Sequence, residues 1–146
     1  MYSCQSIYIE GYKKPLLVDK KISKETKLLR KKLYLISKKG FAIGHQDATA
    51  YGIGWKKSKY PNINKSDIFD MVADHPAVYG FDIGKLENAS DNNIDGIPFS
   101  LMRDLIIDAY KDGGIITMSW HMDNPTSGGD SWEQTPTVTD ILNDKI

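Results

Sequence analysis

The residues best suited to chemistry follow a short apolar run late in the chain. Residues 115–118 are apolar or β-branched, and they are followed at once by polar and aromatic residues: Ser119, Trp120, His121, Asp123 and Asn124. An aromatic ring beside short hydrogen-bonding side chains suits a sugar, because a pyranose has apolar C–H faces and a polar hydroxyl rim. This stretch therefore predicts a sugar-binding site. The alternative is that Trp120 belongs to the core and that His121 is a buried, hydrogen-bonded histidine.

Two earlier segments repeat this design. Residues 41–44 form a short apolar run that opens into His45 and Asp47, and Tyr51 and Trp55 follow. Residues 77–82 form another run, which ends in the carboxylate of Asp82. Polar residues at the C-terminal ends of successive strands are typical of parallel βαβ construction, in which these ends meet on one face.

Helical patterns separate the predicted strands. The spacing predicts a helix over residues 24–39, with Ser23 as N-cap and Gly40 in the left-handed position after its end. A short helix over 67–72, capped by Ser66 and ended by residues 75–76, should follow a turn over 61–66. Leu101, Leu105 and Ala109 share one face of a third helix, which begins at residues 98–99 and ends at the glycine pair 113–114. Residues 137–142 look like the start of a further helix, whereas residues 1–22 are treated as an irregular segment.

The fold class that follows is α/β, with three parallel strands, the last of them buried on both faces. A complete (β/α)8 barrel takes about 250 residues, so a chain of 146 residues is expected to hold about the first three strand–helix units of a TIM barrel. The alternative is an open three-stranded α/β sheet. Residues 23–146 are expected to be the N-terminal part of such a catalytic domain.

Composition excludes several classes of protein. Lys plus Arg equals Asp plus Glu at 19 each, so no overall charge favours nucleic acid, and the lysines of residues 13–39 are interpreted as a solvated helix surface rather than a nucleic-acid arm. Cys4 is the single cysteine, which rules out a disulfide within the chain and a thiolate metal cluster. Gly52 and Gly54 lack the third glycine of a dinucleotide site, because Lys57 takes its place.

Export is a separate question, and the sequence leaves it open. No run approaches the roughly 20 apolar residues of a membrane helix. Residues 1–14 also lack the basic-then-apolar layout of a secretory signal, so the chain as written is predicted to be soluble and unexported. The alternative is that residues 3–6, around Cys4, are the tail of a lipoprotein cleavage site.

Three segments together resemble glycoside hydrolase family 26, which consists chiefly of endo-β-1,4-mannanases, and most of all its members from gut Bacteroidetes. They are residues 44–55 (GHQDATAYGIGW), 75–84 (HPAVYGFDIG) and 113–125 (GGIITMSWHMDNP), the last followed by the glycine pair 128–129 and Trp132. The resemblance implies a (β/α)8 barrel, retaining hydrolysis of β-mannosidic bonds in mannan, glucomannan or galactomannan, and no cofactor or metal. Enzymes of this family are usually secreted, periplasmic or lipid-anchored, which leaves the location of this chain open.

The resemblance also assigns roles to residues. His121 would contact the sugar at the cleavage point, Trp120 and Trp132 would shape the cleft, and Tyr51 and Trp55 would line it. Residues expected to support the site are His45, Asp47, Asp82, Asp123 and Asn124.

Neither catalytic glutamate segment of the family is present, so the chain is predicted to end before both and to be inactive alone. Three parallel strands without their barrel partners leave open edges and exposed apolar faces, which favour either aggregation or pairing with a complementing downstream fragment. The alternative functions are a non-catalytic module that binds manno-oligosaccharide and a vestigial fragment.

Overall fold

The structure is a computed structural model that describes residues 19–57, 65–134 and 138–144. It divides into two compact units, residues 1–41 and 42–146. The predictions for the segment around Cys4, for most of the turn over 61–66 and for Thr137 lie outside the described residues. Among the helices that are described, none has the length and apolar character needed to cross a membrane.

The first unit contains helix α1, Lys24–Lys39, with the predicted bounds. Its N-cap is the predicted one, since Ser23 Oγ accepts a hydrogen bond of 3.1 Å from the backbone N–H of Thr26. The prediction for Gly40 is wrong, because its φ of 165° is extended rather than left-handed. The backbone N–H of Gly40 still closes the last turn on the carbonyl of Ile36, at 2.9 Å, so the helix ends without a left-handed residue.

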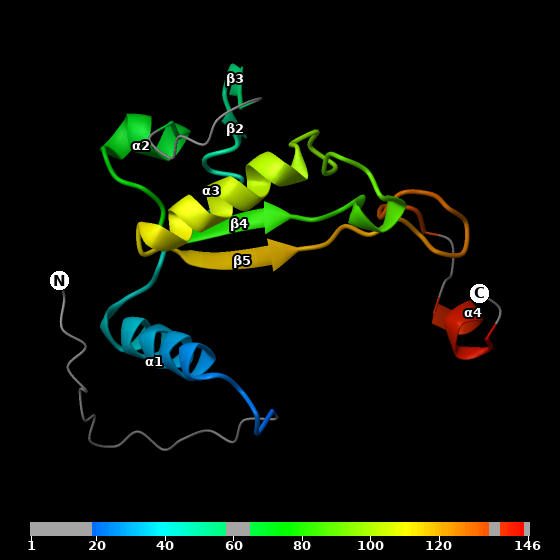
Figure 1. Cartoon of the computed structure of the whole chain (residues 1–146), viewed down its shortest axis with the longest axis horizontal. Coiled ribbons are helices and arrows are strands. Elements are labelled where there is room, and N and C mark those ends of the chain that lie inside the picture. The colour runs from blue at the N-terminus through cyan, green and yellow to red at the C-terminus, as the bar shows by residue number, and fades with distance from the viewer. Residues whose placement is uncertain (1–18, 58–64, 135–137, 145–146) are drawn as a thin grey trace. The chain divides into compact units, whose positions relative to one another are not determined.

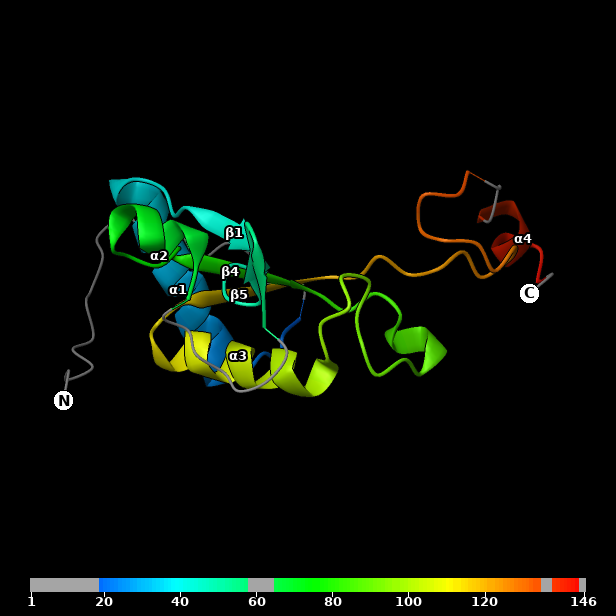
Figure 2. The ribbon, with the colours of Figure 1, turned by 90° about the horizontal axis from the view of Figure 1, so that it is seen from above.

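The second unit is built on a three-stranded parallel sheet in the order β1-β4-β5. The strands are β1, Gly44–Gln46, β4, Val78–Asp82, and β5, Ile115–Ser119. Figure 1 shows β4 and β5 side by side with the same direction, and Figure 2 adds β1 on the other side of β4. Three parallel strands separated by helices confirm the predicted α/β class.

Two details of the predicted strands are wrong. The first strand begins at Gly44 and not at residue 41, because the register of β1 starts where Gly44 faces Val78 of β4, and Phe41 and Ile43 before it are exposed. Strand β5 is not buried on both faces, since 51% of Met118 is exposed. In the described part of the chain β5 pairs with β4 alone, so β4 is the buried strand.

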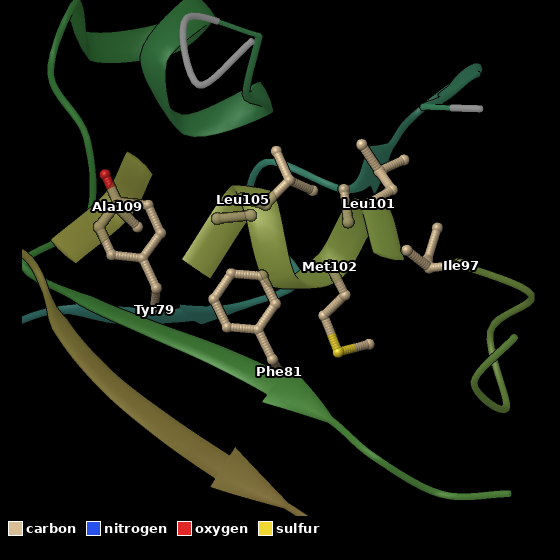
Figure 3. Close-up of a cluster of buried hydrophobic side chains, with 9 residues drawn as sticks. Tyr79, Phe81, Ile97, Leu101, Met102, Leu105 and Ala109 are labelled. Carbon is tan, nitrogen blue, oxygen red and sulfur yellow. The ribbon is translucent and has the colours of Figure 1, made fainter. Parts of the chain in front are cut away.

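The core lies between β4 and helix α3, Phe99–Lys111. Tyr79 and Phe81 point from β4 toward α3, as Figure 3 shows. The helix buries the three predicted residues, Leu101, Leu105 and Ala109, and one more, Met102, at the same face. Alternate residues of β4 therefore anchor α3, and the others face the opposite side of the sheet.

The remaining elements are short. Strands β2, Tyr51–Gly52, and β3, Trp55–Lys56, form an antiparallel hairpin, which the sequence analysis did not predict. Helix α2, Asp67–Val72, has the predicted bounds but ends at a left-handed Ala73, before the predicted stop, and Ser66 occupies its N-cap position without a side-chain cap hydrogen bond. The 3-10 helix η1 is Leu86–Asn88, and helix α4 is Val138–Leu142.

Candidate functional site

Asp82, the last residue of β4, forms hydrogen bonds to the loops that follow β4 and β5. Its buried carboxylate accepts hydrogen bonds from Ser119 Oγ at 2.6 Å, from the backbone N–H of Gly84 at 2.7 Å and from His121 Nδ1 at 2.5 Å. The parallel register places Ser119 directly beside Asp82. Burial raises the pKa of Asp82, but the hydrogen bonds from Ser119, Gly84 and His121 outweigh it and hold that pKa below its usual value. Asp82 is therefore an ionised acceptor.

Two further features bring the loops together at this carboxylate. Gly84 lies so close to the loop after β5 that a Cβ atom there would stand 2.6 Å from the carbonyl oxygen of His121. Asn93 donates from Nδ2 to the carbonyl of Asp82 at 3.1 Å, and its Oδ1 accepts from the backbone N–H groups of Asp95 and Ile97. Asn93 was not predicted from the sequence, although an asparagine two residues before Asp95-Gly96 is a recognisable turn former.

His121 is half exposed, with 49% of its side chain accessible. Because the Asp82 carboxylate can only accept, His121 Nδ1 carries the proton of this bond, and Nε2 is an acceptor whenever the ring is in its neutral form. The imidazole also stacks on the indole of Trp132, with ring centroids 5.4 Å apart and an interplanar angle of 9°. The alternative interpretation of His121 as a buried histidine is wrong.

Trp120 is 52% exposed, so the alternative that places it in the core is also wrong. Its Nε1 donates to Glu87 Oε2 at 3.0 Å, and the other oxygen of Glu87 accepts from the backbone N–H of Asp123 at 2.7 Å. The Asp123 carboxylate in turn accepts from Asn88 Nδ2 at 2.6 Å. Glu87 and Asn88 belong to η1, and neither was predicted from the sequence.

The pKa of Glu87 is held below its usual value, first by the backbone N–H of Asp123 and then by the Trp120 indole. Glu87 is thus an anion that bridges two neighbouring groups.

Asn124 shapes the loop that leads to Trp132. Its side-chain Oδ1 accepts from the backbone N–H groups of Thr126 at 2.9 Å and Ser127 at 3.3 Å. Its backbone N–H and carbonyl pair with Gly129 and Gly128, at 2.7 and 2.8 Å. These bonds fold the loop back, so that Trp132 reaches the face of His121.

Asp47, directly after β1, is buried and differs sharply from Asp82. Among the described residues, its Oδ2 accepts one hydrogen bond, from Gln46 Nε2 at 3.4 Å, and its Oδ1 is buried without a hydrogen-bond partner. Burial, followed by the charge of Asp95, raises the pKa of Asp47 to about 7. The loop is anchored by its backbone, since the N–H of Asp47 donates to Gly80 and its carbonyl accepts from Ala50, each at 2.8 Å. His45 lies within β1 and is exposed.

The two aromatic residues of the β2–β3 hairpin have other partners. Trp55 Nε1 donates to Asp67 Oδ1 at 2.6 Å, and Lys65 Nζ lies 5.5 Å from the centre of the Trp55 ring. Tyr51 packs against the core, and its hydroxyl lies near the Asp95 carboxylate. Burial and the neighbouring carboxylates raise the pKa of Tyr51.

The structure therefore forms one continuous group at the ends of β4 and β5. It comprises Asp82, Glu87, Ser119, Trp120, His121, Asp123 and Trp132. Exposed aromatic rings beside oriented polar groups suit a carbohydrate ligand.

Known proteins have a similar fold. A β-mannanase of family GH26 from Bacteroides ovatus has a similar structure, with a TM-score of 0.76 and 38% identity over 84% of this chain and 35% of that chain. An endo-β-1,4-mannanase from Cellulomonas fimi matches with a TM-score of 0.61 and 25% identity, over 82% of this chain and 28% of that one. A mannan endo-1,4-β-mannosidase from Bifidobacterium adolescentis is 28% identical over 131 residues, which are 12% of its length.

This chain thus spans only a minor part of each relative. The match to the Bacteroides ovatus structure confirms that the fold is part of a (β/α)8 barrel. The sequence model of glycosyl hydrolase family 26 matches residues 18–145, which is most of the sequence. The chain therefore belongs to glycosyl hydrolase family 26.

Proposed function

We propose that this chain forms part of the mannan-binding cleft of a β-mannanase, and that His121, Trp120 and Trp132 contact the sugar. The observation that carries the proposal is the stacked pair of His121 and Trp132, held by the Asp82 carboxylate at the ends of two parallel strands. The relatives are named as β-mannanases, which supports a β-mannoside as the ligand.

The chemistry of each group fits this assignment. Trp132 is 66% exposed although His121 covers part of one face, so apolar ring surface is available to a pyranose. His121 Nε2 can accept a hydrogen bond from a sugar hydroxyl, because Nδ1 already donates to Asp82. The supporting roles fall to Asp82, Asp123 and Asn124 through the loop contacts described above, and to Asp47 and His45 through the end of β1.

The proposed contact set leaves out Tyr51 and Trp55. Tyr51 is partly buried against the core, the indole N–H of Trp55 is bound by Asp67, and Lys65 lies over the ring of Trp55. A ring whose face is already occupied by a cation is a poor platform for a sugar.

The carboxylates described here are proposed to be structural rather than catalytic. Retaining glycosidases use two carboxyl groups about 5–5.5 Å apart, one as acid/base and one as nucleophile. Both oxygens of Asp82 and both oxygens of Glu87 accept hydrogen bonds from the protein itself. We therefore expect the 146-residue chain to bind manno-oligosaccharide without hydrolysing it.

The test is a titration of the purified chain with mannohexaose, followed by the indole N–H resonances in two-dimensional NMR spectra. We expect weak, millimolar binding that Trp132→Ala abolishes, because the aromatic surface is lost. Tyr110→Ala is the matched control, since Tyr110 is an exposed aromatic residue of α3. Equal shifts with cellohexaose would refute selectivity for mannosides, and no shift with either sugar would refute binding.

A parallel assay measures reducing ends released from mannan by the same preparation. We expect no release above the buffer blank. Release that disappears in Asp82→Asn or Asp123→Asn would overturn the assignment of these carboxylates as structural groups.

A further inference from the structure

Glu87 makes contacts that no family resemblance led us to expect. It lies in η1, in the loop after β4, yet each oxygen of its carboxylate accepts from a residue in the loop after β5. One partner is the indole N–H of Trp120 at 3.0 Å, and the other is the backbone N–H of Asp123 at 2.7 Å. Trp120 and Asp123 lie on either side of His121 and Met122 in the sequence.

The two hydrogen bonds and the charge of Glu87 give its carboxylate a defined orientation. A carboxylate that accepts from two N–H groups forms charge-assisted hydrogen bonds, which are stronger than bonds between neutral groups. The two oxygens have separate partners, so the position of the carboxylate is fixed by the Asp123 backbone while its second oxygen is aimed at the indole. Trp120 is half exposed, and packing alone does not restrict its ring as it would in a core.

An aromatic platform for a sugar must be held at a defined orientation, because stacking depends on the face that the ring presents. The only polar atom of an indole ring is Nε1, and in Trp120 this atom is bound by Glu87. The bond to Glu87 is therefore a direct restraint on the rotation of the ring about its side-chain torsions.

We propose that Glu87 is a positioning residue that fixes the Trp120 ring at the sugar site. The proposal rests on the proposed function for its effect on sugar binding, whereas its effect on Trp120 itself is independent of any ligand. Glu87 acts on the site through the Trp120 ring, its bond to the Asp123 backbone holds the carboxylate in place, and it does not contact the sugar.

The first experiment needs no ligand. In the full chain labelled with 15N, the indole N–H resonance of Trp120 is assigned by its loss in Trp120→Phe. We expect Glu87→Ala to move this resonance upfield and to speed its exchange with solvent, because the charged acceptor is removed. The indole resonance of Trp55, bonded to Asp67, should stay in place and reports that the fold is intact.

Asn88→Ala is the matched control. Asn88 is the next residue of η1 and ties the same loop through the Asp123 side chain, but it does not touch the indole. If Glu87 is only one more tether for the loop, both variants will change the Trp120 resonance alike. A response to Glu87→Ala but not to Asn88→Ala supports positioning, and no response to either overturns the proposal.

The second experiment is a double-mutant cycle on mannohexaose binding. We expect Glu87→Ala to weaken binding about three- to tenfold, the size of one lost hydrogen bond, and to have no further effect in the Trp120→Phe background. An equal effect in both backgrounds would show that Glu87 acts by another route. If the unmodified chain does not bind mannohexaose, the proposed function fails while the ligand-free result for Trp120 still stands.

Discussion

Two buried aspartates show how single residues at equivalent strand ends acquire opposite properties. Asp82 is surrounded by donors from Ser119, Gly84 and His121, which hold its pKa below the usual value. Asp47 has one distant amide donor, and burial raises its pKa to about 7. The number of donors that reach the carboxylate therefore decides which protonation state the fold favours.

Asp47→Asn should change how stability depends on pH. Because the pKa of Asp47 is raised above its usual 3.8 in the folded state, the folded chain holds this proton more tightly than the unfolded chain. This tighter proton binding contributes to the free energy of unfolding in full below about pH 4, and the contribution is lost as the pH rises toward 7. Asparagine removes the ionisation and tolerates the left-handed backbone at this position, where φ is 51°. We expect the variant to be more stable than the unmodified chain at pH 8 and similar at pH 4, as measured by urea unfolding.

Asp82→Asn should have the opposite effect. The pKa of Asp82 is lowered, so its contribution to stability is present above the unfolded value near 4 and is lost as the pH falls through the folded pKa. An amide has the shape of the carboxylate but only one acceptor oxygen. The donors around Asp82 bind two oxygens in the unmodified chain. We expect a loss of about 1–3 kcal/mol at pH 7 that shrinks at pH 3, measured by the same urea titrations.

The two aspartate variants are each other's control, because they exchange the same groups at neighbouring strand ends. A destabilisation of equal size in both at pH 8 would contradict the assigned environments.

How much of the site the sequence predicts depends on the kind of contact. Asp82 and His121 were found because parallel strands bring their C-terminal ends together, whatever the loops do. Glu87 was missed because its bond to Trp120 depends on the path of η1, which no period in the sequence specifies.

At the scale of elements, the helices follow the sequence more closely than the strands. The apolar spacing and Ser23 define α1, and the same spacing defines the buried face of α3. Strand β1 was misplaced because its bounds are set by pairing with β4, not by the apolar run before it. The β2–β3 hairpin was not predicted because each strand has two residues, too few to show a period in the sequence. Gly54, with a φ of 73°, marks its turn.

The packing of α3 on β4 leads to a prediction for one helix face. Leu105 is fully buried beside Phe81 in the core cluster, whereas Ile107 on the same helix is 37% exposed. Leu105→Ala should therefore lower the free energy of unfolding by about 2–5 kcal/mol, through lost burial and the cavity it leaves. Ile107→Ala should cost clearly less, and urea unfolding of both variants compares them. Equal losses would place the core on a different face of α3.

At the scale of the whole molecule, the described sheet has two edge strands, β1 and β5, each with one unpaired side. Within the described residues, β1 and β5 each pair with β4 alone. In β5, Ile115 donates its N–H to Ala77 and Ser119 accepts from Ile83, so the N–H of Met118 points away from β4, because successive residues of a strand alternate in direction. A free edge beside exposed apolar side chains favours pairing with another strand.

The relatives provide a way to test whether these edges are completed by further barrel strands. The chain matches 35% of the Bacteroides ovatus β-mannanase, so the unmatched remainder of that enzyme is a candidate complement. We expect the two pieces, refolded together, to form a soluble complex that releases reducing ends from mannan, whereas neither piece does so alone.

The edge of β5 supplies the decisive variants for this experiment. Met118→Pro removes the outward N–H while leaving the ladder to β4 in place, because that N–H is not part of it. Met118→Ala shortens the same side chain but keeps the N–H, and it is the matched control. We expect Met118→Pro to abolish both the complex and the activity, and Met118→Ala to retain them. A complex that forms equally with both variants would mean that the pieces associate without strand pairing at β5, whereas a stable monomer that gains no activity would exclude completion of the barrel in this way.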